Sequence, residues 1–284
     1  MGRWEATHAT APPLLPSCML RSLRIYNDHA PICVDFEELC GFAQDSLPWL
    51  QVAFGGQFPL DCLSERTPQE QDALLSSAAV SLAHARVRHP DKLVQPSALP
   101  AEVSAERRRL TASGPAGGAP ADGFRVQIAY RRLLPKEDAL AVIVTGRLLF
   151  TFDPDDLRYH ARTIVPGQPA LISVPGLVEG PAKPREYYLA LRSLGAAAFD
   201  ELARARAAEA FRGRFLDYDD SRTTEVIKGY ILQAVAYELV GDPFCRDPNC
   251  RLYNAHHQEE MLHAQLVSGK LCPYHEEILK RGPE

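Results

Sequence analysis

The sequence predicts an α/β protein. Short apolar segments of strand length lie in the middle of the chain, long helix-like segments follow them, and a segment rich in cysteine and histidine comes last. The chain has 284 residues, of which 46% are hydrophobic and 24% charged. These values are typical of a globular protein with a substantial core. No internal repeat is present, and we expect a single α/β domain over residues 19–284.

Strands and helices alternate in the first part of this domain. Leu20–Asp28 mixes alternation with β-branched residues and ends in turn residues, which predicts an opening strand. Cys33–Leu47 has apolar residues at helical spacing, and the following LQVAFGGQF indicates a second strand. Thr67–Val87 begins with Thr-Pro and an early acidic turn, which favours a long helix.

Two segments are predicted to be flexible. Residues 1–18 are interpreted as a disordered extension, or as the product of an upstream start codon with Met19 as the natural beginning. A flexible insertion is expected at about 96–123, since it is rich in Pro and Ala and ends in TASGPAGGAPADG. We expect limited proteolysis to cut Met1–Cys18 and Thr111–Gly123 first, because such residues bury little against the entropy of ordering.

The central part predicts buried strands followed by two helices. Ala139–Gly146 (ALAVIVTG) is an apolar run typical of a strand buried on both faces. LLFTFD, YHARTIV and ALISVPGL have strand lengths and are separated by Asp-Pro-Asp and Pro-Gly. A helix is expected over 185–215, with an interruption at Gly195. Another is expected over Ser221–Val240, where Glu238 lies on the apolar stripe and Gly241 marks the end.

Composition and charge argue against two functional classes. The net charge of −5 argues against a nucleic-acid binder that uses a broad basic face. No stretch reaches the roughly 18 apolar residues that indicate a membrane span. No signal peptide precedes the domain, and the seven cysteines form an odd number, so we expect a cytoplasmic protein.

The last part of the chain predicts a metal site. Cys245, Cys250, Cys272 and His275 have the spacing C-x4-C-x21-C-x2-H, and zinc prefers four such ligands in a tetrahedron. Because the protein supplies all four ligands, no position is left for a water molecule, and this zinc is expected to be structural. The alternative is that unconnected core cysteines lie beside a surface histidine.

The same segment resembles the archaemetzincins, zinc metallopeptidases of the metzincin group. Their signature is similar to H-E-x-x-H-x-x-G-x-x-H-C-x4-C-x-M with a downstream C-x2-C. In this chain Gly241, Cys245 and Cys250 match it, and the C-x2-C falls on Cys272 and His275. The resemblance covers roughly residues 139–279. It implies a metzincin-like core, a twisted mixed sheet packed on helices, with Ser221–Val240 as the active-site helix.

The catalytic positions of that signature are degenerate here. The first metal histidine corresponds to Ala234, the general-base glutamate to Val235 and the second histidine to Glu238. The third histidine corresponds to Phe244, and the methionine to Leu252. An H-E-x-x-H helix presents two imidazoles to zinc while its glutamate takes a proton from the bound water. That mechanism cannot operate with these side chains.

A rearranged site could replace the lost one. The segment NAHHQEEMLHAQ follows the cysteine pair, and on a helix its acids and histidines would share faces at i,i+3 and i,i+4. Glu238, His256 and Glu260 are the candidate catalytic residues, and His257 and His263 are candidate ligands of a second metal. The alternatives are a polar helix face with i,i+4 pairs, and, for Glu238, a salt bridge to an arginine or lysine.

These residues are compatible with two functions from different classes. The chain is either a metallopeptidase-like protein with one structural zinc and a lost or rearranged catalytic motif, or a non-catalytic descendant that binds a peptide or protein. A peptide or protein is thus the expected partner, with neither nucleic acid nor membrane. A zinc-ribbon nucleic-acid module is a weaker third alternative. Substrate and oligomeric state are not determined by the sequence.

Overall fold

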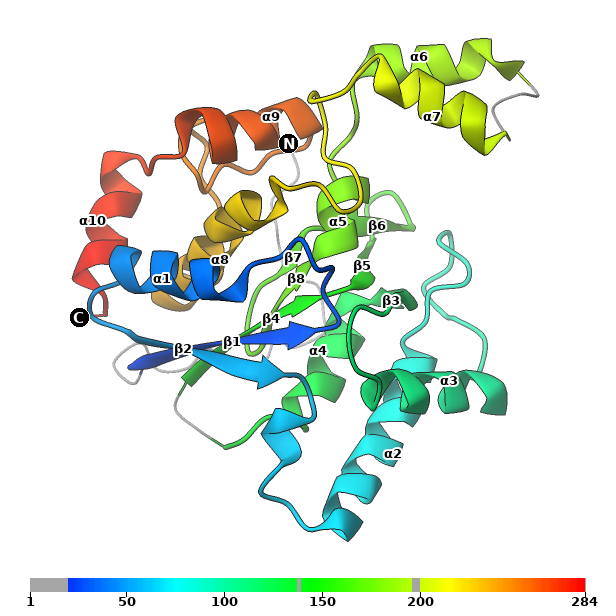
Figure 1. The fold of residues 1–284 in the computed structure, drawn as a ribbon, viewed down its shortest axis with the longest axis vertical. Helices are drawn as coiled ribbons and strands as arrows, with labels where there is room; N and C mark the ends of the chain where they lie inside the picture. Colours follow the sequence, from blue (N-terminus) through cyan, green and yellow to red (C-terminus); the bar gives the residue numbers. More distant parts are fainter. Residues whose placement is uncertain (1–19, 137–138, 196–199, 284) are drawn as a thin grey trace.

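A five-stranded sheet forms the centre of the protein (Figure 1). The computed structural model describes residues 20–136, 139–195 and 200–283, so the predicted extension 1–18 lies outside the described residues. The strands, in the order β2-β1-β4-β8-β7, are β1 (Ser22–Asp28), β2 (Gln51–Gln57), β4 (Ala139–Thr145), β7 (Ile164–Val165) and β8 (Ala170–Ser173). All neighbours are parallel except β7, which pairs with β8 in the antiparallel direction.

Helices cover both faces of this sheet. α1 (Phe36–Ser46) and α8 (Thr223–Val240) pack on one face, and α2 (Pro68–His84) and α4 (Gly123–Arg131) lie on the other (Figure 1). Each face has its own hydrophobic core, and both cores draw on the fully buried strand β4. The predicted α/β class is therefore confirmed.

The period of two along β4 explains how one strand serves both cores. Leu140, Val142 and Val144 point to the face of α1 and α8, whereas Ala141 and Ile143 point to the face of α2 and α4. Successive side chains of a strand alternate between faces, so a strand covered on both sides must be apolar throughout. The prediction that this segment is buried on both faces is confirmed.

A smaller sheet lies beside the first. It has the order β3-β5-β6, with β3 (Gly118–Asp122) parallel and β6 (Arg158–Arg162) antiparallel to β5 (Arg147–Asp153). Helix α3 (Pro100–Leu110) precedes β3 and packs against α2.

Regular structure therefore occupies much of the predicted insertion at 96–123. Pro100 begins α3, and Glu102 accepts a hydrogen bond from the backbone N–H of Leu99, as in a capping box. Glu106 and Arg109 are buried, which ties the helix to the body of the protein. The expectation of an irregular segment is wrong for α3 and β3, while residues 111–117 are irregular. We accordingly expect proteolytic cutting in this region within 111–117 and not within α3 or β3.

Three shorter helices differ from the sequence prediction in detail. α5 (Val174–Glu179) replaces the second half of the strand expected for ALISVPGL. The Ser173 hydroxyl accepts a hydrogen bond from the N–H of Gly176, and Pro175 lies in the first turn, so the chain enters a helix there. The helix expected over 185–215 is α6 (Arg185–Ser193) and α7 (Glu201–Glu209), with Gly195 in the left-handed region at φ 54° between them.

The C-terminal part packs against α8 on the same face as α1 (Figure 1). It contains α9 (Gln258–Leu262), the π-helical turn η4 (His263–Ser268) and α10 (Pro273–Arg281). The 3-10 turn η2 (Asp61–Leu63) follows β2. Among the described residues, no helix combines the length and the apolar character needed to cross a membrane.

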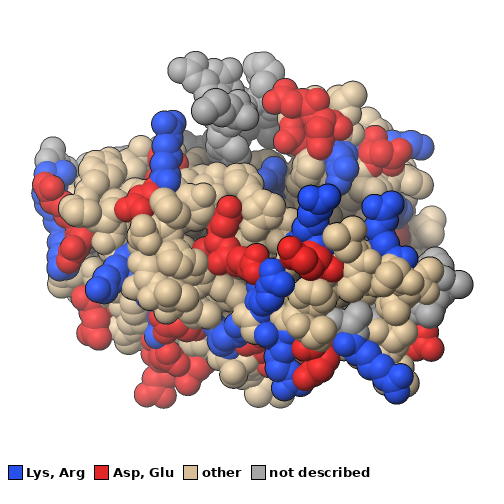
Figure 2. Space-filling view, turned by 90° about the horizontal axis from the view of Figure 1, so that it is seen from above, with Lys and Arg blue, Asp and Glu red and all other residues tan. Residues whose placement is uncertain are grey.

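Charges of both signs are interspersed on the face of the molecule shown in Figure 2. Lysine and arginine residues alternate with aspartate and glutamate residues there, and neither sign forms a continuous field. A protein that binds nucleic acid non-specifically needs many basic groups along one phosphate backbone. This face therefore offers no broad basic surface, in agreement with the net charge of −5.

Candidate metal centre

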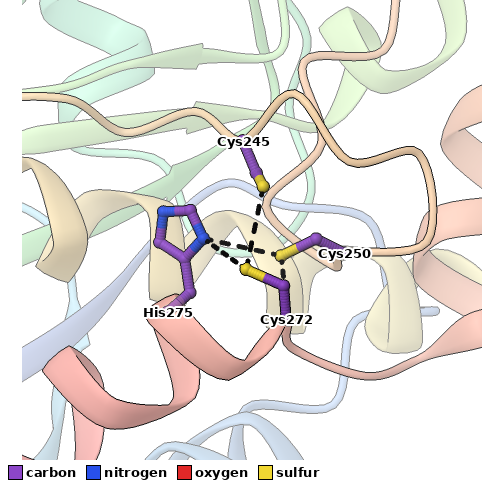
Figure 3. Close-up of side chains that lie close together, drawn as sticks. All are labelled: Cys245, Cys250, Cys272 and His275. Atoms are coloured by element: carbon purple, nitrogen blue, oxygen red, sulfur yellow. Dashed lines mark hydrogen bonds between the residues drawn. The ribbon is translucent and has the colours of Figure 1, made fainter.

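Three segments bring the four predicted ligands together (Figure 3). Helix α8 ends at Gly241, whose φ of 74° is left-handed and whose N–H donates to the carbonyl of Tyr237. A residue with a side chain would be strained there, so glycine ends the helix and turns the chain toward Cys245. Cys272 is the N-cap of α10, and His275 lies in the first turn of that helix.

The loop between the first two cysteines is held by its own turn residues. Asp247 accepts hydrogen bonds at its side chain from the N–H of Asn249 (2.9 Å) and at its carbonyl from the N–H of Cys250 (3.0 Å). Such an Asx turn is the usual role of Asp-Pro-Asn sequences. The turn folds the chain back so that Cys245 and Cys250 face the same point.

The donor atoms are spaced as a tetrahedral ion requires. The Sγ atoms of Cys245 and Cys272 are 3.9 Å apart, and Nδ1 of His275 lies 3.1 Å from Sγ of Cys272 and 3.7 Å from Sγ of Cys250. All four donors lie within 4.8 Å of one another. Two sulfurs bound to one zinc at about 2.3 Å are separated by about 3.8 Å in a tetrahedron. The prediction that these four residues converge is therefore confirmed.

Burial shapes the electrostatics of this group. Cys250 is fully buried, and burial raises the pKa of its thiol to about 12; burial also raises the pKa of Cys245 and lowers that of His275. Without a cation the pocket thus favours neutral thiols and a neutral imidazole. A neutral imidazole is ready to coordinate, whereas the thiols need the charge of a bound cation to ionise.

Backbone amides surround the sulfur atoms. The N–H of Asp247 donates to Sγ of Cys245, and the N–H of Cys272 donates to Sγ of Cys250, both at 3.4 Å. Such bonds orient thiolates and stabilise their charge. Three sulfurs and one imidazole nitrogen are the donor set that zinc accepts in structural sites, and four protein donors complete a tetrahedron. The residues present therefore fit a zinc ion without an open position.

Two buried side chains that the sequence alone did not identify fix the C-terminal segment to the rest of the fold. The guanidinium of Arg251, next to Cys250, donates to the carboxylate of Glu225 on α8 and to the carbonyl of Gln265. The amide of Gln258 donates to the carbonyls of Leu177 and Val178 at the end of α5. No local sequence pattern marks these contacts, because each joins segments that are distant along the chain.

The helix that the resemblance identified as the active-site helix carries no metal ligands at the expected positions. Ala234 and Val235 are fully buried in the core of the α1 and α8 face, and Phe244 packs against the same core. Glu238 is 4% exposed on this helix, so its carboxylate is also withdrawn from solvent. The polypeptide thus offers an apolar helix where the resembling enzymes present two histidines.

The candidates for a rearranged site have other partners. The carboxylate of Glu260 accepts from the backbone N–H groups of His256 (2.9 Å) and His257 (3.0 Å), because His257 is the N-cap of α9. Glu259 pairs with Arg214 at 2.7 Å, and the ring of His263 bonds the amide of Asn249 at 2.9 Å. These contacts give the side chains of Glu259, Glu260 and His263 structural roles.

The structure therefore does not bring the proposed second set of ligands together. Within residues 20–136, 139–195 and 200–283, the three cysteines and His275 are the one group of at least three His, Cys, Asp or Glu side chains whose donor atoms are close enough to share an ion. The expected i,i+4 relation of His256 to Glu260 is replaced by a capping contact, since the helix begins only at Gln258.

Comparison with known proteins places the chain in a family. Residues 19–282 match the model of a probable metallopeptidase family, DUF6775. No curated protein matches the chain. The crystal structure of a zinc-dependent peptidase from Methanocorpusculum labreanum (strain Z) matches with 11% identity and a TM-score of 0.39, covering 91% of this chain and 100% of that one. The finer likeness to the archaemetzincins stays a prediction. Because the family match spans nearly all of the sequence, the chain belongs to this probable metallopeptidase family.

Proposed function

We propose that this member of the family binds one zinc ion as a structural element and does not hydrolyse peptides by the zinc-water mechanism. The observation that supports this most directly is the complete donor set of three sulfurs and one imidazole nitrogen. A zinc ion held by four protein ligands has no position for a water molecule or a substrate carbonyl. Bound there, zinc stabilises the fold of the C-terminal segment.

The arrangement of α8 supports the same conclusion. Metal-assisted hydrolysis needs an ion with an open position and a base near the water that it activates. Ala234 and Val235 can supply neither a ligand nor a base, and Glu260 is committed to two backbone amides. In this role the protein keeps the architecture of its family and binds a peptide or protein partner without cleaving it.

Metal content and peptidase activity test the proposal together. We expect one zinc per chain by elemental mass spectrometry, since the described residues provide one complete ligand group. We also expect no chelator-sensitive cleavage of a mixed peptide library, with zinc, cobalt or manganese added, under conditions in which an active zinc peptidase cleaves it.

One pattern of results would favour a rearranged active site instead. It consists of two metals per chain and chelator-sensitive cleavage that is lost in both Glu238→Ala and His256→Ala. Cleavage that persists in both variants would show that other residues carry the activity, and it would equally contradict a non-hydrolytic function.

A further inference from the structure

An apolar groove lies between α1 and the edge strand β2, on a different element from the metal centre. Its volume is about 570 Å³, and the residues that line it include Glu37, Cys40, Gly41, Gln44, Val52 and Phe54. The side chain of Phe54 is 50% exposed, although its ring centroid lies 5.2 Å from that of Phe36, with the two rings tilted by 42°. An edge strand presents unpaired backbone N–H and C=O groups to another chain, and here an exposed aromatic ring lies beside that edge.

The outer edge of β2 is open to a further strand beyond the two backbone groups that Gln44 occupies. β2 is the first strand of the sheet order, and β1 is its one partner among the described strands. The amide of Gln44 donates to the carbonyl of Leu50 (2.9 Å), and its oxygen accepts from the N–H of Val52 (3.1 Å). This side chain thus imitates one peptide group of a neighbouring strand. Backbone groups of successive residues point alternately to the two edges of a strand. The N–H and carbonyl of Phe54 therefore point to the same outer edge as those of Val52.

Gly41 gives an independent indication that the groove accommodates a ligand. It lies in the interior of α1, where glycine costs about 0.5–1 kcal/mol relative to alanine. Close packing does not require it, because a Cβ built at this position meets no atom within 4 Å. Its backbone is helical, so no left-handed conformation requires it either. The missing side chain has one evident consequence, which is that the groove stays open.

The charge and spacing of α1 define what fits there. Glu37 lies one helical turn before Gly41, about 6 Å along the axis, and two residues of an extended strand span about 6.7 Å. A bound strand can therefore place one side chain over Gly41 and another, two residues away, beside Glu37. No described residue forms an ion pair with Glu37, whereas its neighbour Glu38 pairs with Lys228 at 2.7 Å. α1 contains further acidic residues and no basic residue.

We propose that this groove binds an extended peptide segment of a partner protein that adds to β2 as a sixth strand. The segment carries a leucine-sized apolar side chain over Gly41 and a lysine or arginine two residues away beside Glu37. Main-chain hydrogen bonds to the edge of β2 provide the affinity, and the two side chains provide the selectivity. This binding depends neither on the zinc ion nor on the absence of hydrolysis.

The first test uses two fluorescein-labelled heptapeptides, Ser-Thr-Leu-Thr-Lys-Thr-Ser and the same peptide with Leu and Lys exchanged. Fluorescence anisotropy with the full chain is expected to show saturable binding of at least one. Gly41→Leu fills the groove and should weaken binding about tenfold or more, the factor that corresponds to burying one apolar side chain. Gly41→Ala is the matched control: it should bind nearly normally and raise Tm, since alanine favours the helix.

The second test addresses the charge. Replacing Lys by Glu in the peptide should weaken binding, and Glu37→Gln should remove that difference, about three- to fivefold for a solvent-exposed pair. Asp45→Asn is the matched control, because Asp45 lies on the same helix but does not line the groove. We expect Asp45→Asn to retain the preference for lysine, and Glu37→Lys to prefer the glutamate peptide.

The third measurement locates the peptide. Cys40 lines the groove and Cys62 does not, so bound peptide should slow alkylation of Cys40 by iodoacetamide while leaving the alkylation of Cys62 unchanged.

Equal binding by wild type and Gly41→Leu, or saturation by neither peptide, would overturn the proposal. Evidence that one of two other occupants fills the groove would also overturn the proposal. These are a dimer that Gly41→Leu disrupts, and the chain's own N-terminal residues, shown by Cys40 reacting only after residues 1–18 are removed.

Discussion

Replacing Cys250 with serine is expected to remove the zinc ion and to destabilise the protein strongly. Cys250 is fully buried, and its sulfur lies 3.7 Å from Nδ1 of His275. Serine offers a hydroxyl that does not replace a thiolate as a zinc ligand, and three remaining ligands do not close the tetrahedron. We expect zinc content to fall from one equivalent to near zero.

The loss of stability follows from the linkage between metal binding and folding. Structural zinc sites contribute their binding free energy to the folded state, because the unfolded chain does not hold the four ligands together. We expect the free energy of unfolding to fall by about 4 kcal/mol and Tm by about 10 °C for a chain of this size. Calorimetry of the zinc-loaded protein, with zinc determined on the same sample, measures both effects.

Cys40→Ser provides the matched control. It makes the same chemical change at a half-buried cysteine. Cys40 lies on α1 and is not one of the four predicted ligands. We expect it to retain one zinc and to lose far less stability. If Cys250→Ser kept its zinc, or if chelation left the Tm of wild type unchanged, a structural role of the metal centre would be wrong.

The elements that the sequence predicted well are those determined by local patterns. β4 is an uninterrupted apolar run, and only a strand covered on both faces allows every side chain of such a run to be buried. The metal centre was predictable for a similar reason. The short spacings of Cys245 to Cys250 and of Cys272 to His275 bring two pairs of ligands together by local turns, so only one long-range contact remained to be inferred.

The residues predicted for a second metal site are not brought together in the structure, and the reason is local. His256 and Glu260 share a helix face only if the helix extends through both, but α9 begins at Gln258. The carboxylate of Glu260 then bonds back to the N–H groups at the helix start, which is the capping-box arrangement. Glutamate three residues after the N-cap could have indicated this role, and the histidine content of the segment obscured it.

The helix α3 within residues 96–123 was not predictable, because it depends on contacts across the fold. Arg147 begins β5 and is fully buried, and its guanidinium bonds the carboxylate of Glu106 on α3, 41 residues earlier. No local pattern joins these two positions. The Ala- and Pro-rich composition around α3 suggested a loop, whereas a buried ion pair fixes the helix to the smaller sheet.

Replacing Arg147 with methionine is expected to destabilise the protein by about 3–5 kcal/mol, because it leaves a buried carboxylate without its main partner. Nη2 of Arg147 lies 2.7 Å from Oε2 of Glu106, and both side chains are at most 1% exposed. Arg86 also bonds Glu106, at 3.0 Å, but it bonds Oε1, so Oε2 would lose the donor that Arg147 provides. Chemical denaturation followed by circular dichroism measures the change.

Arg107→Met is the matched control for this prediction. Arg107 lies on α3 next to Glu106 and pairs with Asp72 at 2.8 Å, but its side chain is 30% exposed and that of Asp72 is 72% exposed. An exposed ion pair contributes about 0–1 kcal/mol, so the same substitution should cost little there. Equal losses in the two variants would show that the buried pair has no special role.

The dependence on pH gives a further check on the same ion pair. Burial by itself would raise the pKa of Glu106, but the charge of Arg147 and the hydrogen bonds from Arg147 and Arg86 outweigh it, so the pKa is lowered from its ordinary 4.5. A carboxyl group with a lowered pKa in the folded state contributes stability that is present above about pH 4.5 and is lost as the pH falls through the folded-state pKa. Glu106→Gln lacks this ionisation. The stability difference between wild type and Glu106→Gln should therefore be largest near neutral pH and shrink below pH 4.5, whereas a difference that stays constant with pH would contradict an ionised Glu106 as the partner of Arg147.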